Sequence, residues 1–158
     1  MNINTKILNA RDKKDAKFLR KKTAKFDFKK HTKSEITKLV SQMKAIMLSA
    51  NGQGLAANQI GLNSSVFVAQ VDGKFYAVFN PTITKATEEK DTWQGEGCLS
   101  LPGVTAPTYS PAKLTLEGQD KNGKKLKIKA WGMLALTFQH EVDHLNGKLF
   151  IDRRVVNS

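Results

Sequence analysis

Hydrophobic residues between residues 36 and 50 recur every three to four positions, which is the period of an amphipathic helix with one buried face. Thr32 followed by Glu35 has the pattern of a capping box at the start of a helix, and Asn51-Gly52 is a typical helix end. We therefore predict a helix over this segment, with its buried face formed by Ile36, Leu39, Val40, Met43, Ile46, Met47 and Ala50.

The pattern then changes to short runs rich in β-branched and aromatic residues, which is typical of strands. VFVAQV and KFYAVFNPTIT lie between Ser64 and Lys85 and are separated by Asp72-Gly73, a strong hairpin turn. Further strand-like runs occupy Thr92–Leu101, Lys113–Glu117 and Lys125–Ala130, the last two linked through Asn122-Gly123. Strands joined by tight turns pair antiparallel. We expect an α+β fold in which antiparallel sheets pack around a long second helix that begins near Trp131.

Length and composition favour one domain over residues 1–158, since the chain is too short for two comfortable cores. Residues 1–33 are rich in lysine and are interpreted as a basic N-terminal arm on the body. No apolar run reaches the roughly 18 to 20 residues of a membrane span, and the start lacks the apolar core of a secretory signal. We expect a cytoplasmic protein without a membrane partner, or an organellar one if the arm includes a targeting signal.

The formal net charge of +12 raises the question of nucleic-acid binding, because basic surfaces attract phosphate whatever the base sequence. Lysines outnumber arginines, they are scattered, and no Arg-rich or aromatic-interleaved patch is evident in the linear sequence. We therefore expect no specific nucleic-acid binding and interpret the charge as a solvated surface.

Candidate chemistry is concentrated in LTFQHEVDHL, Leu136 to Leu145. On a helix, residues four apart lie one above the other, so His140 and His144 present two imidazoles to one point. Glu141 directly follows the first histidine and can reach a metal-bound water, so the H-E-x-x-H pattern indicates two metal ligands and a general base. The alternative from this stretch alone is a helix with two histidines that serve only as structural hydrogen-bonding groups.

Cys98 is the candidate third ligand, and it is the one cysteine of the chain, which excludes an internal disulfide. It lies in GEGCLSL after Gly97, which lets the main chain approach a site closely. Cysteine and two histidines would leave one coordination position for water, as in catalytic rather than structural metal sites.

With these residues identified, the chain resembles the peptide deformylase family. Three blocks in order carry the resemblance: GQGLAANQ from Gly52 to Gln59, EGCLS from Glu96 to Ser100, and QHEVDHLNGKLF from Gln139 to Phe150. The resemblance implies a hydrolase of protein biosynthesis that acts co-translationally, removing the N-terminal formyl group from nascent polypeptides that start with formyl-methionine. Formylated nascent peptides are then the expected partners, and we expect the protein to be a monomer.

The resemblance also implies residue roles for a reaction that uses metal-bound water or hydroxide. Cys98, His140 and His144 hold one divalent metal, and Glu141 acts as general base and then acid. The side chain of Gln59 and the main-chain N–H of Leu99 hold the formyl oxygen. The family favours Fe(II) in the cell, while Zn(II), Ni(II) or Co(II) could occupy the site in purified protein.

A substrate pocket can be assigned from the same segments. Met133, Leu136 and Thr137 precede His140 on or near the helix face that carries the metal, and would line an apolar pocket for the methionine side chain. Gly54 and Gly97 leave main chain free to pair with an extended peptide, and Gln53 would border the pocket. Ordinary core packing is the competing explanation for the three helical side chains.

The chain departs from the family pattern in several places. Gln53 replaces a branched aliphatic residue, and Asn58 is uncommon before the glutamine. Val104 to Pro111 lacks the two arginines that the family often carries there, and no long helix follows Phe150, so we expect at most weak ribosome association. A zinc endopeptidase and a non-catalytic module that binds formylated ends or RNA are the alternative functions.

Overall fold

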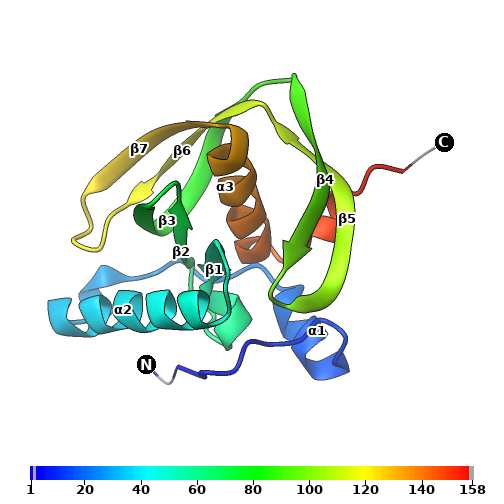
Figure 1. The fold of residues 1–158 in the computed structure, drawn as a ribbon. Coiled ribbons are helices and arrows are strands. Elements are labelled where there is room, and N and C mark those ends of the chain that lie inside the picture. Colours follow the sequence, from blue (N-terminus) through cyan, green and yellow to red (C-terminus); the bar gives the residue numbers. More distant parts are fainter. Residues whose placement is uncertain (2, 157–158) are drawn as a thin grey trace.

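The computed structural model describes residues 1 and 3–156. In this part of the chain an α+β fold is formed by three α-helices and two antiparallel sheets (Figure 1). The helices are α1 (Lys13–Leu19), α2 (Lys33–Ser49) and α3 (Gly132–Leu145). The larger sheet has the order β1-β2-β3-β6-β7, with strands β1 (Gly54–Ala56), β2 (Val66–Val71), β3 (Lys74–Ala86), β6 (Lys113–Gln119) and β7 (Lys125–Trp131). The smaller sheet pairs β4 (Lys90–Cys98) with β5 (Leu101–Pro111).

The first predicted helix is confirmed as α2, including its capping box. The Thr32 hydroxyl accepts a hydrogen bond from the Glu35 backbone N–H at 3.2 Å, and the Glu35 carboxylate accepts one from the Thr32 N–H at 2.7 Å. These two bonds satisfy donors that the first helical turn leaves free. The predicted apolar face is buried against β1, β2 and β3, and its buried members are Ile36, Leu39, Val40, Met43 and Met47.

The hairpin between β2 and β3 is also confirmed. Asp72 and Gly73 both have positive φ, 51° and 77°, which is the backbone of the two-residue turn that matches strand twist. The predicted strand Thr92–Leu101 extends too far toward the C-terminus, because β4 ends at Cys98 and Leu101 is the first residue of β5. The sequence did not predict β5, which carries three prolines that cannot donate to a ladder. β4 is the one strand of the sheet that pairs with β5 in the described residues, and the other edge of β5 is contacted by the C-terminal segment through an isolated bridge between Thr108 and Arg154.

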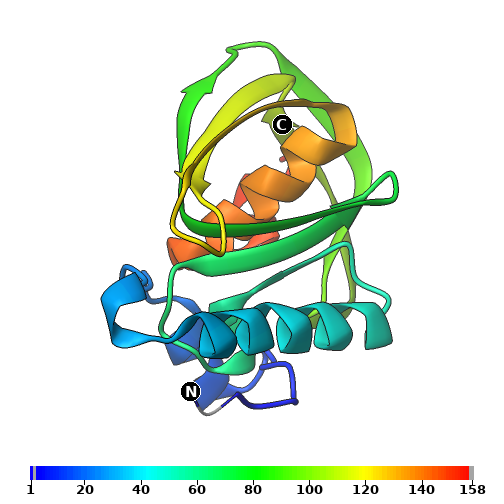
Figure 2. The ribbon, with the colours of Figure 1, turned by 90° about the vertical axis from the view of Figure 1, so that its left-hand side faces the viewer.

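Helix α3 lies between the two sheets, and the strands of the larger sheet curve around it (Figures 1 and 2). One face of α3 packs on the larger sheet through Ala135, Phe138, Val142 and Leu145. The opposite face points toward β4. A single helix therefore contributes to the core and carries the candidate ligands, which fixes their positions through packing.

Residues 3–33 lie along the body and contain a helix, α1, that the sequence did not predict. Asp12 caps this helix by accepting from the N–H groups of Lys14 and Asp15. Backbone bonds attach the segment to the body, from Leu8 N–H to the Gln59 carbonyl at 2.7 Å and from Ala10 N–H to the Ser100 carbonyl at 2.8 Å. A third backbone bond, from Thr23 N–H to the Leu145 carbonyl at 2.8 Å, means that the N-terminal segment contacts all three motif blocks.

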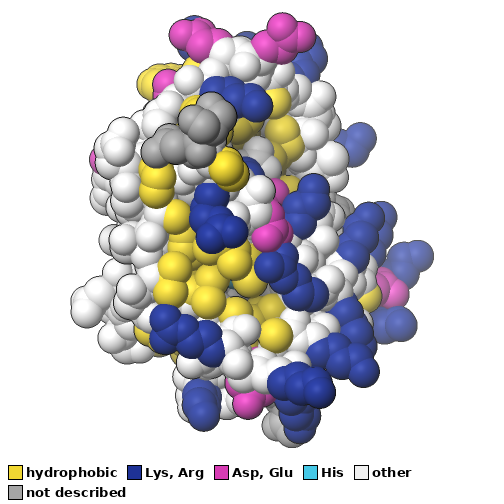
Figure 3. Space-filling view, turned by 90° about the vertical axis from the view of Figure 1, so that its right-hand side faces the viewer, with side chains coloured by type: hydrophobic (Ala, Val, Ile, Leu, Met, Phe, Trp, Pro, Cys, Tyr) yellow, Lys and Arg dark blue, Asp and Glu magenta, His cyan; other side chains and the backbone are white. Residues whose placement is uncertain are grey.

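The face that carries β5 and the C-terminal segment has hydrophobic side chains at its centre with lysines and arginines around them (Figure 3). Its inner layer is a small cluster of Leu101, Leu149 and Phe150. Within the described residues, no helix has the length and apolar character required to cross a membrane.

Candidate metal centre

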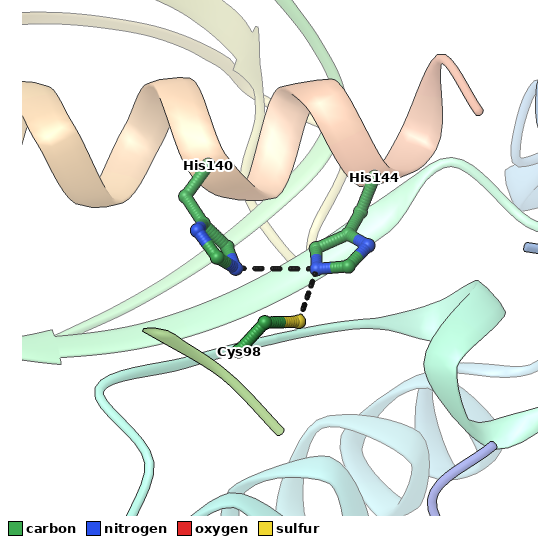
Figure 4. A group of neighbouring side chains, drawn as sticks. All are labelled: Cys98, His140 and His144. Carbon is green, nitrogen blue, oxygen red and sulfur yellow. Dashed lines mark hydrogen bonds between the residues drawn. The ribbon is translucent and has the colours of Figure 1, made fainter. Parts of the chain in front are cut away.

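Three candidate ligands from distant parts of the chain meet at one point (Figure 4). Cys98 is the last residue of β4, while His140 and His144 lie one turn apart on α3. The His144 Nε2 atom lies 3.2 Å from the Cys98 sulfur and 3.2 Å from the His140 Nε2 atom. All three ligand atoms lie within 4.8 Å of one another. One sulfur and two imidazole nitrogens in this arrangement fit a divalent transition metal.

The charges around the rings also fit a bound cation. Burial lowers the pKa of His144 well below its ordinary value, which keeps the ring in the neutral form that binds metal. Burial has the same effect on His140, but hydrogen bonds to Cys98 and Glu96 outweigh it and raise the His140 pKa well above the ordinary value. The site therefore favours positive charge at His140, and a metal cation would supply it.

Glu96 orients the His140 ring from behind. Its Oε1 atom lies 2.7 Å from His140 Nδ1, so that the other ring nitrogen, Nε2, faces the sulfur. The second carboxylate oxygen accepts from the Thr108 hydroxyl. Burial would raise the Glu96 pKa, but the hydrogen bonds from His140 and the charge of Arg153 hold it below the ordinary value. Glu96 is therefore a buried carboxylate that stays charged.

Arg153 supplies the charge that keeps this carboxylate ionised. Its guanidinium donates to both Glu96 oxygens, at 2.7 and 3.2 Å, and its Nε donates to Asp143 at 2.7 Å. A further bond reaches the Tyr109 carbonyl at 2.7 Å. Sequence reasoning assigned no role to Glu96 or Arg153. The sequence contained one indication of this ion pair, namely the acidic Glu96 in the second block and the arginine of Asp152-Arg153 after the third block. The segment Val104 to Pro111 has no arginine that could take this place.

Glu141 also lies on α3 and is buried like Glu96, but it lines the cleft and differs from Glu96 in its hydrogen bonding. The residue is 2% exposed, and its Oε2 atom has no hydrogen-bond partner among the described residues. Burial raises its pKa to about 7, against the lowering effect of His140. A Cβ placed on Gly54 would lie 2.2 Å from its Oε1 atom, so a larger residue at 54 would displace this carboxylate from its position. Gly54 thus has a second role besides the predicted main-chain pairing.

Gln59 is held with its amide group directed at the ligand set. Its Oε1 accepts from the Ala56 N–H at 2.9 Å, and its Nε2 donates to the Ser100 hydroxyl at 3.2 Å and lies 3.7 Å from the Cys98 sulfur. Because the oxygen is fixed by the main chain, the NH₂ end faces the site. The neighbouring departure, Asn58, is buried and donates to the His144 carbonyl at 2.6 Å, so it anchors the end of α3.

A cleft of about 520 Å³ opens onto these groups. Its walls include Cys98, Leu99, His140 and Glu141, whereas His144 lies behind them, fully buried. All the predicted substrate-binding residues line it: Gln53, Gly54, Gly97, Met133, Leu136 and Thr137. The Thr137 hydroxyl donates to the Met133 carbonyl at 2.8 Å, so this hydroxyl is already hydrogen-bonded within the helix. The cleft brings together apolar side chains, free main chain and the candidate chemistry.

An α+β fold with a candidate Cys-His-His ligand set beside a buried carboxylate in a cleft is typical of metal-dependent hydrolases. The family model described as Polypeptide deformylase matches residues 5–157. The chain belongs to this family, and it is an enzyme whose activity is the deformylation of polypeptides.

Similar proteins and structures agree with this assignment. A peptide deformylase of Halothermothrix orenii is 44% identical over 128 residues, which cover 77% of this chain and 82% of that protein. One of Treponema pallidum (strain Nichols) is 41% identical over 119 residues, covering 75% and 73%. The structure of the Thermotoga maritima peptide deformylase is 31% identical with a TM-score of 0.86, covering 96% of this chain and 97% of that one. A Synechococcus elongatus peptide deformylase in complex with actinonin is 33% identical with a TM-score of 0.85, covering 96% and 79%.

Proposed function

We propose that this chain removes the formyl group from nascent polypeptides that begin with formyl-methionine, with Glu141 as general base and acid. The observation that carries the proposal is the convergence of Cys98, His140 and His144 beside the unpartnered Glu141 carboxylate in one cleft. Hydrolysis of a formamide needs a nucleophile, a place for negative charge on the formyl oxygen and a proton for the leaving amine. Each of these has a candidate group here.

Cys98, His140 and His144 would hold one divalent metal, which lowers the pKa of a water molecule toward ~7 when bound and so provides a nucleophile. The thiolate and imidazole donors suit Fe(II) and Zn(II), and Ni(II) or Co(II) can substitute. We propose Fe(II) in the cell. Cys98 serves as a ligand in this scheme, so no covalent intermediate on its sulfur is required.

Glu141 accepts the proton of the attacking water and delivers it to the amine of the departing peptide. Support comes from its place in the cleft wall and from its Oε2 atom, which is free of partners within the described chain. A buried carboxylate without a partner is costly to maintain, and proton transfer by a positioned group typically contributes about 10²–10⁴-fold to a rate.

The Gln59 amide and the Leu99 main-chain N–H would stabilise the negative charge that develops on the formyl oxygen. Support for Gln59 is the fixed direction of its NH₂ group, and support for Leu99 is its position in the cleft wall next to Cys98. Losing one donor of this kind typically raises a barrier by about 2.7 to 4 kcal/mol.

The methionine side chain would occupy the apolar part of the cleft, against Met133, Leu136 and Thr137. The peptide that follows would pair with main chain at Gly54 and Gly97, with Gln53 at the rim. Such pairing reads few side chains, so broad tolerance beyond the first residue follows. A monomer in the cytoplasm, with weak ribosome association at most, completes the proposal.

Formate release from formyl-Met-Ala by anaerobically purified protein, loaded separately with Fe(II), Ni(II) or Co(II), tests this function. We expect turnover with the formylated peptide and none with acetyl-Met-Ala, whose extra methyl group crowds the reacting carbon. Absence of formate with all three metals would overturn the proposal. Cleavage of internal bonds in an unformylated peptide would indicate an endopeptidase instead, and binding of formyl-Met-Ala without turnover would indicate a non-catalytic module.

A further inference from the structure

Strand β7 has a strictly alternating sequence, KLKIKAW, at the edge of the larger sheet. Lys125, Lys127, Lys129 and Trp131 are exposed, whereas the residues between them are half-buried or buried. Side chains of a strand alternate between the two faces of a sheet. The core therefore takes Leu126, Ile128 and Ala130, and the lysines and the tryptophan share the outer face.

The register of the sheet adds lysines from the two neighbouring strands around Trp131. Lys113 of β6 is the direct partner of Trp131, and Thr115 is the partner of Lys129. Thr115 is in turn opposite Lys85 of β3. Directly paired residues lie on the same face, so one surface carries a set that we call the Lys–Trp face: Lys85, Lys113, Lys127, Lys129 and Trp131.

The Lys–Trp face is hollowed rather than flat. A depression of about 570 Å³ is lined by Lys85, Lys113, Lys129 and Trp131, with Thr115 among the other lining residues. Trp131 is 68% exposed, the most exposed aromatic side chain among the described residues. None of the residues of the Lys–Trp face lines the cleft of the metal centre, so a ligand could bind here while the cleft works.

The lysines of this face are not neutralised by the protein. Within the described chain, the ammonium groups of Lys85, Lys113, Lys127 and Lys129 form no ion pair and no hydrogen bond, and only the main chain of Lys113 bonds a side chain, that of Thr87. The acidic residue in register on the face is Glu117, opposite Lys127. The surface therefore keeps an excess of positive charge around an exposed aromatic ring.

Protection of a sheet edge explains only part of this surface. Lysines on an edge strand prevent sheets from pairing with one another, which accounts for Lys127 and Lys129. It does not account for Lys85 and Lys113, because β3 and β6 have partners on both sides. It does not account for Trp131 either, since an exposed aromatic ring favours association rather than preventing it.

A ligand that combines repeated negative charge with flat apolar groups would match both features. Phosphates pair with lysines, and an unpaired base stacks on an aromatic side chain without regard to its identity. A duplex hides its base faces, and an acidic peptide offers charge without a ring at every position. We propose that the Lys–Trp face binds single-stranded RNA without sequence specificity, independently of the deformylase reaction.

Fluorescence anisotropy of a labelled single-stranded 12-mer RNA, titrated with metal-loaded full-length protein at several salt concentrations, tests the proposal. Four lysine–phosphate contacts predict a slope of log K against log salt of about −2.8, at about −0.7 per contact. The triple variant Lys113→Gln, Lys127→Gln, Lys129→Gln should lose about 2 units of that slope. Trp131→Ala should weaken binding about 5- to 100-fold with an unchanged slope, and Trp131→Phe should retain most of the affinity.

The matched control removes the same charge from another exposed surface, through Lys13→Gln, Lys14→Gln and Lys17→Gln on α1. This control should bind RNA nearly as well as the parent protein, and thermal unfolding should confirm that every variant is folded. Equal loss in both triple variants would overturn the proposal in favour of diffuse attraction by the net charge. An unchanged affinity of Trp131→Ala would remove stacking, and binding to phosphatidylglycerol vesicles but not to RNA would reassign the face to a lipid surface.

Discussion

Two carboxylates lie on opposite sides of the same histidine, and their surroundings differ completely. Glu96 is bound by His140, Arg153 and Thr108, so that both of its oxygens have partners. Glu141, which follows His140 on α3, is equally buried but leaves one oxygen without a partner in the described structure. The first side of the centre is saturated with hydrogen bonds, and the second is left open toward the cleft.

This difference suggests separate roles for the two carboxylates, with Glu96 supporting the metal ligands and Glu141 taking part in the proposed reaction. Groups that are fully hydrogen-bonded hold the ligands in one geometry, and a rigid frame lowers the cost of placing a reactive group beside them. In the proposed reaction, the open carboxylate keeps a free lone pair for a proton. Mutations on the two sides should therefore fail in different ways, by loss of metal on the Glu96 side and by loss of turnover on the Glu141 side.

Glu141→Gln should give the largest effect on turnover. The amide has nearly the same shape but cannot take up a proton, so kcat should fall by about 10²–10⁴-fold. Metal content, measured by atomic emission on the same preparation, should remain at one per chain. Retained activity would remove Glu141 from its role, and a loss of metal would make it a ligand.

Gly54→Ala should displace the Glu141 carboxylate without changing its chemical nature. The added Cβ would lie 2.2 Å from the Glu141 Oε1 atom and must displace it, and a misplacement of about 1 Å can cost 10²-fold in rate. Gly95→Ala is the matched control, because Gly95 also lines the cleft and its Cβ would meet no atom within 4 Å. Equal kcat/KM values for the two variants would contradict the assigned space for Glu141.

Arg153→Met tests the saturated side of the centre. Without the guanidinium, Glu96 and Asp143 lose their shared cation, and the orientation of His140 is no longer fixed. Metal affinity, measured by chelator competition, should fall about 10- to 100-fold. Arg154→Met is the control, because this neighbouring arginine is exposed and, among the described residues, its side chain donates to the Ile151 carbonyl alone. Metal binding by both variants as tight as in the parent protein would contradict a supporting role for Arg153.

The exposed ion pair between Arg20 and Asp152 should have the smallest effect. Burial would raise the Asp152 pKa, but the hydrogen bond from Arg20 outweighs this and holds the pKa below its ordinary value of 3.8. A lowered folded-state pKa adds stability above pH 3.8 that is lost as pH falls through the folded value. Because both side chains are about 40% exposed, Arg20→Gln should cost below about 1 kcal/mol in urea unfolding at pH 7 and less still near pH 3. A pH-independent difference would exclude this linkage.

The two carboxylates also show which features could be predicted from the sequence and which could not. The sequence singled out Glu141 because the H-E-x-x-H spacing to His140 is local, although its role remains a proposal, and it predicted α2 because the period and capping box of that helix are local. The support of Glu96 by Arg153 depends on two residues 57 positions apart that meet only when η3 (Phe150–Arg153) packs against the smaller sheet. Strand β5 was missed for the same reason, since its pairing with β4 overrides three prolines.

The Lys–Trp face could not be predicted from the sequence either, because it also depends on contacts between distant residues. Along the chain the lysines are scattered, and only the register of β3, β6 and β7 gathers Lys85 and Lys113 around Trp131. The alternation of KLKIKAW was a local signal for one strand of that surface. The other two strands could not be assigned to it before the sheet order was known.

The most direct test of the account is X-ray absorption spectroscopy of the Co(II)-loaded protein compared with its Cys98→Ser variant. The account predicts one sulfur and two imidazole nitrogens around the metal in the parent protein, and loss of the sulfur in the variant. A parent spectrum with nitrogen and oxygen neighbours alone would contradict the convergence of Cys98, His140 and His144 on one metal.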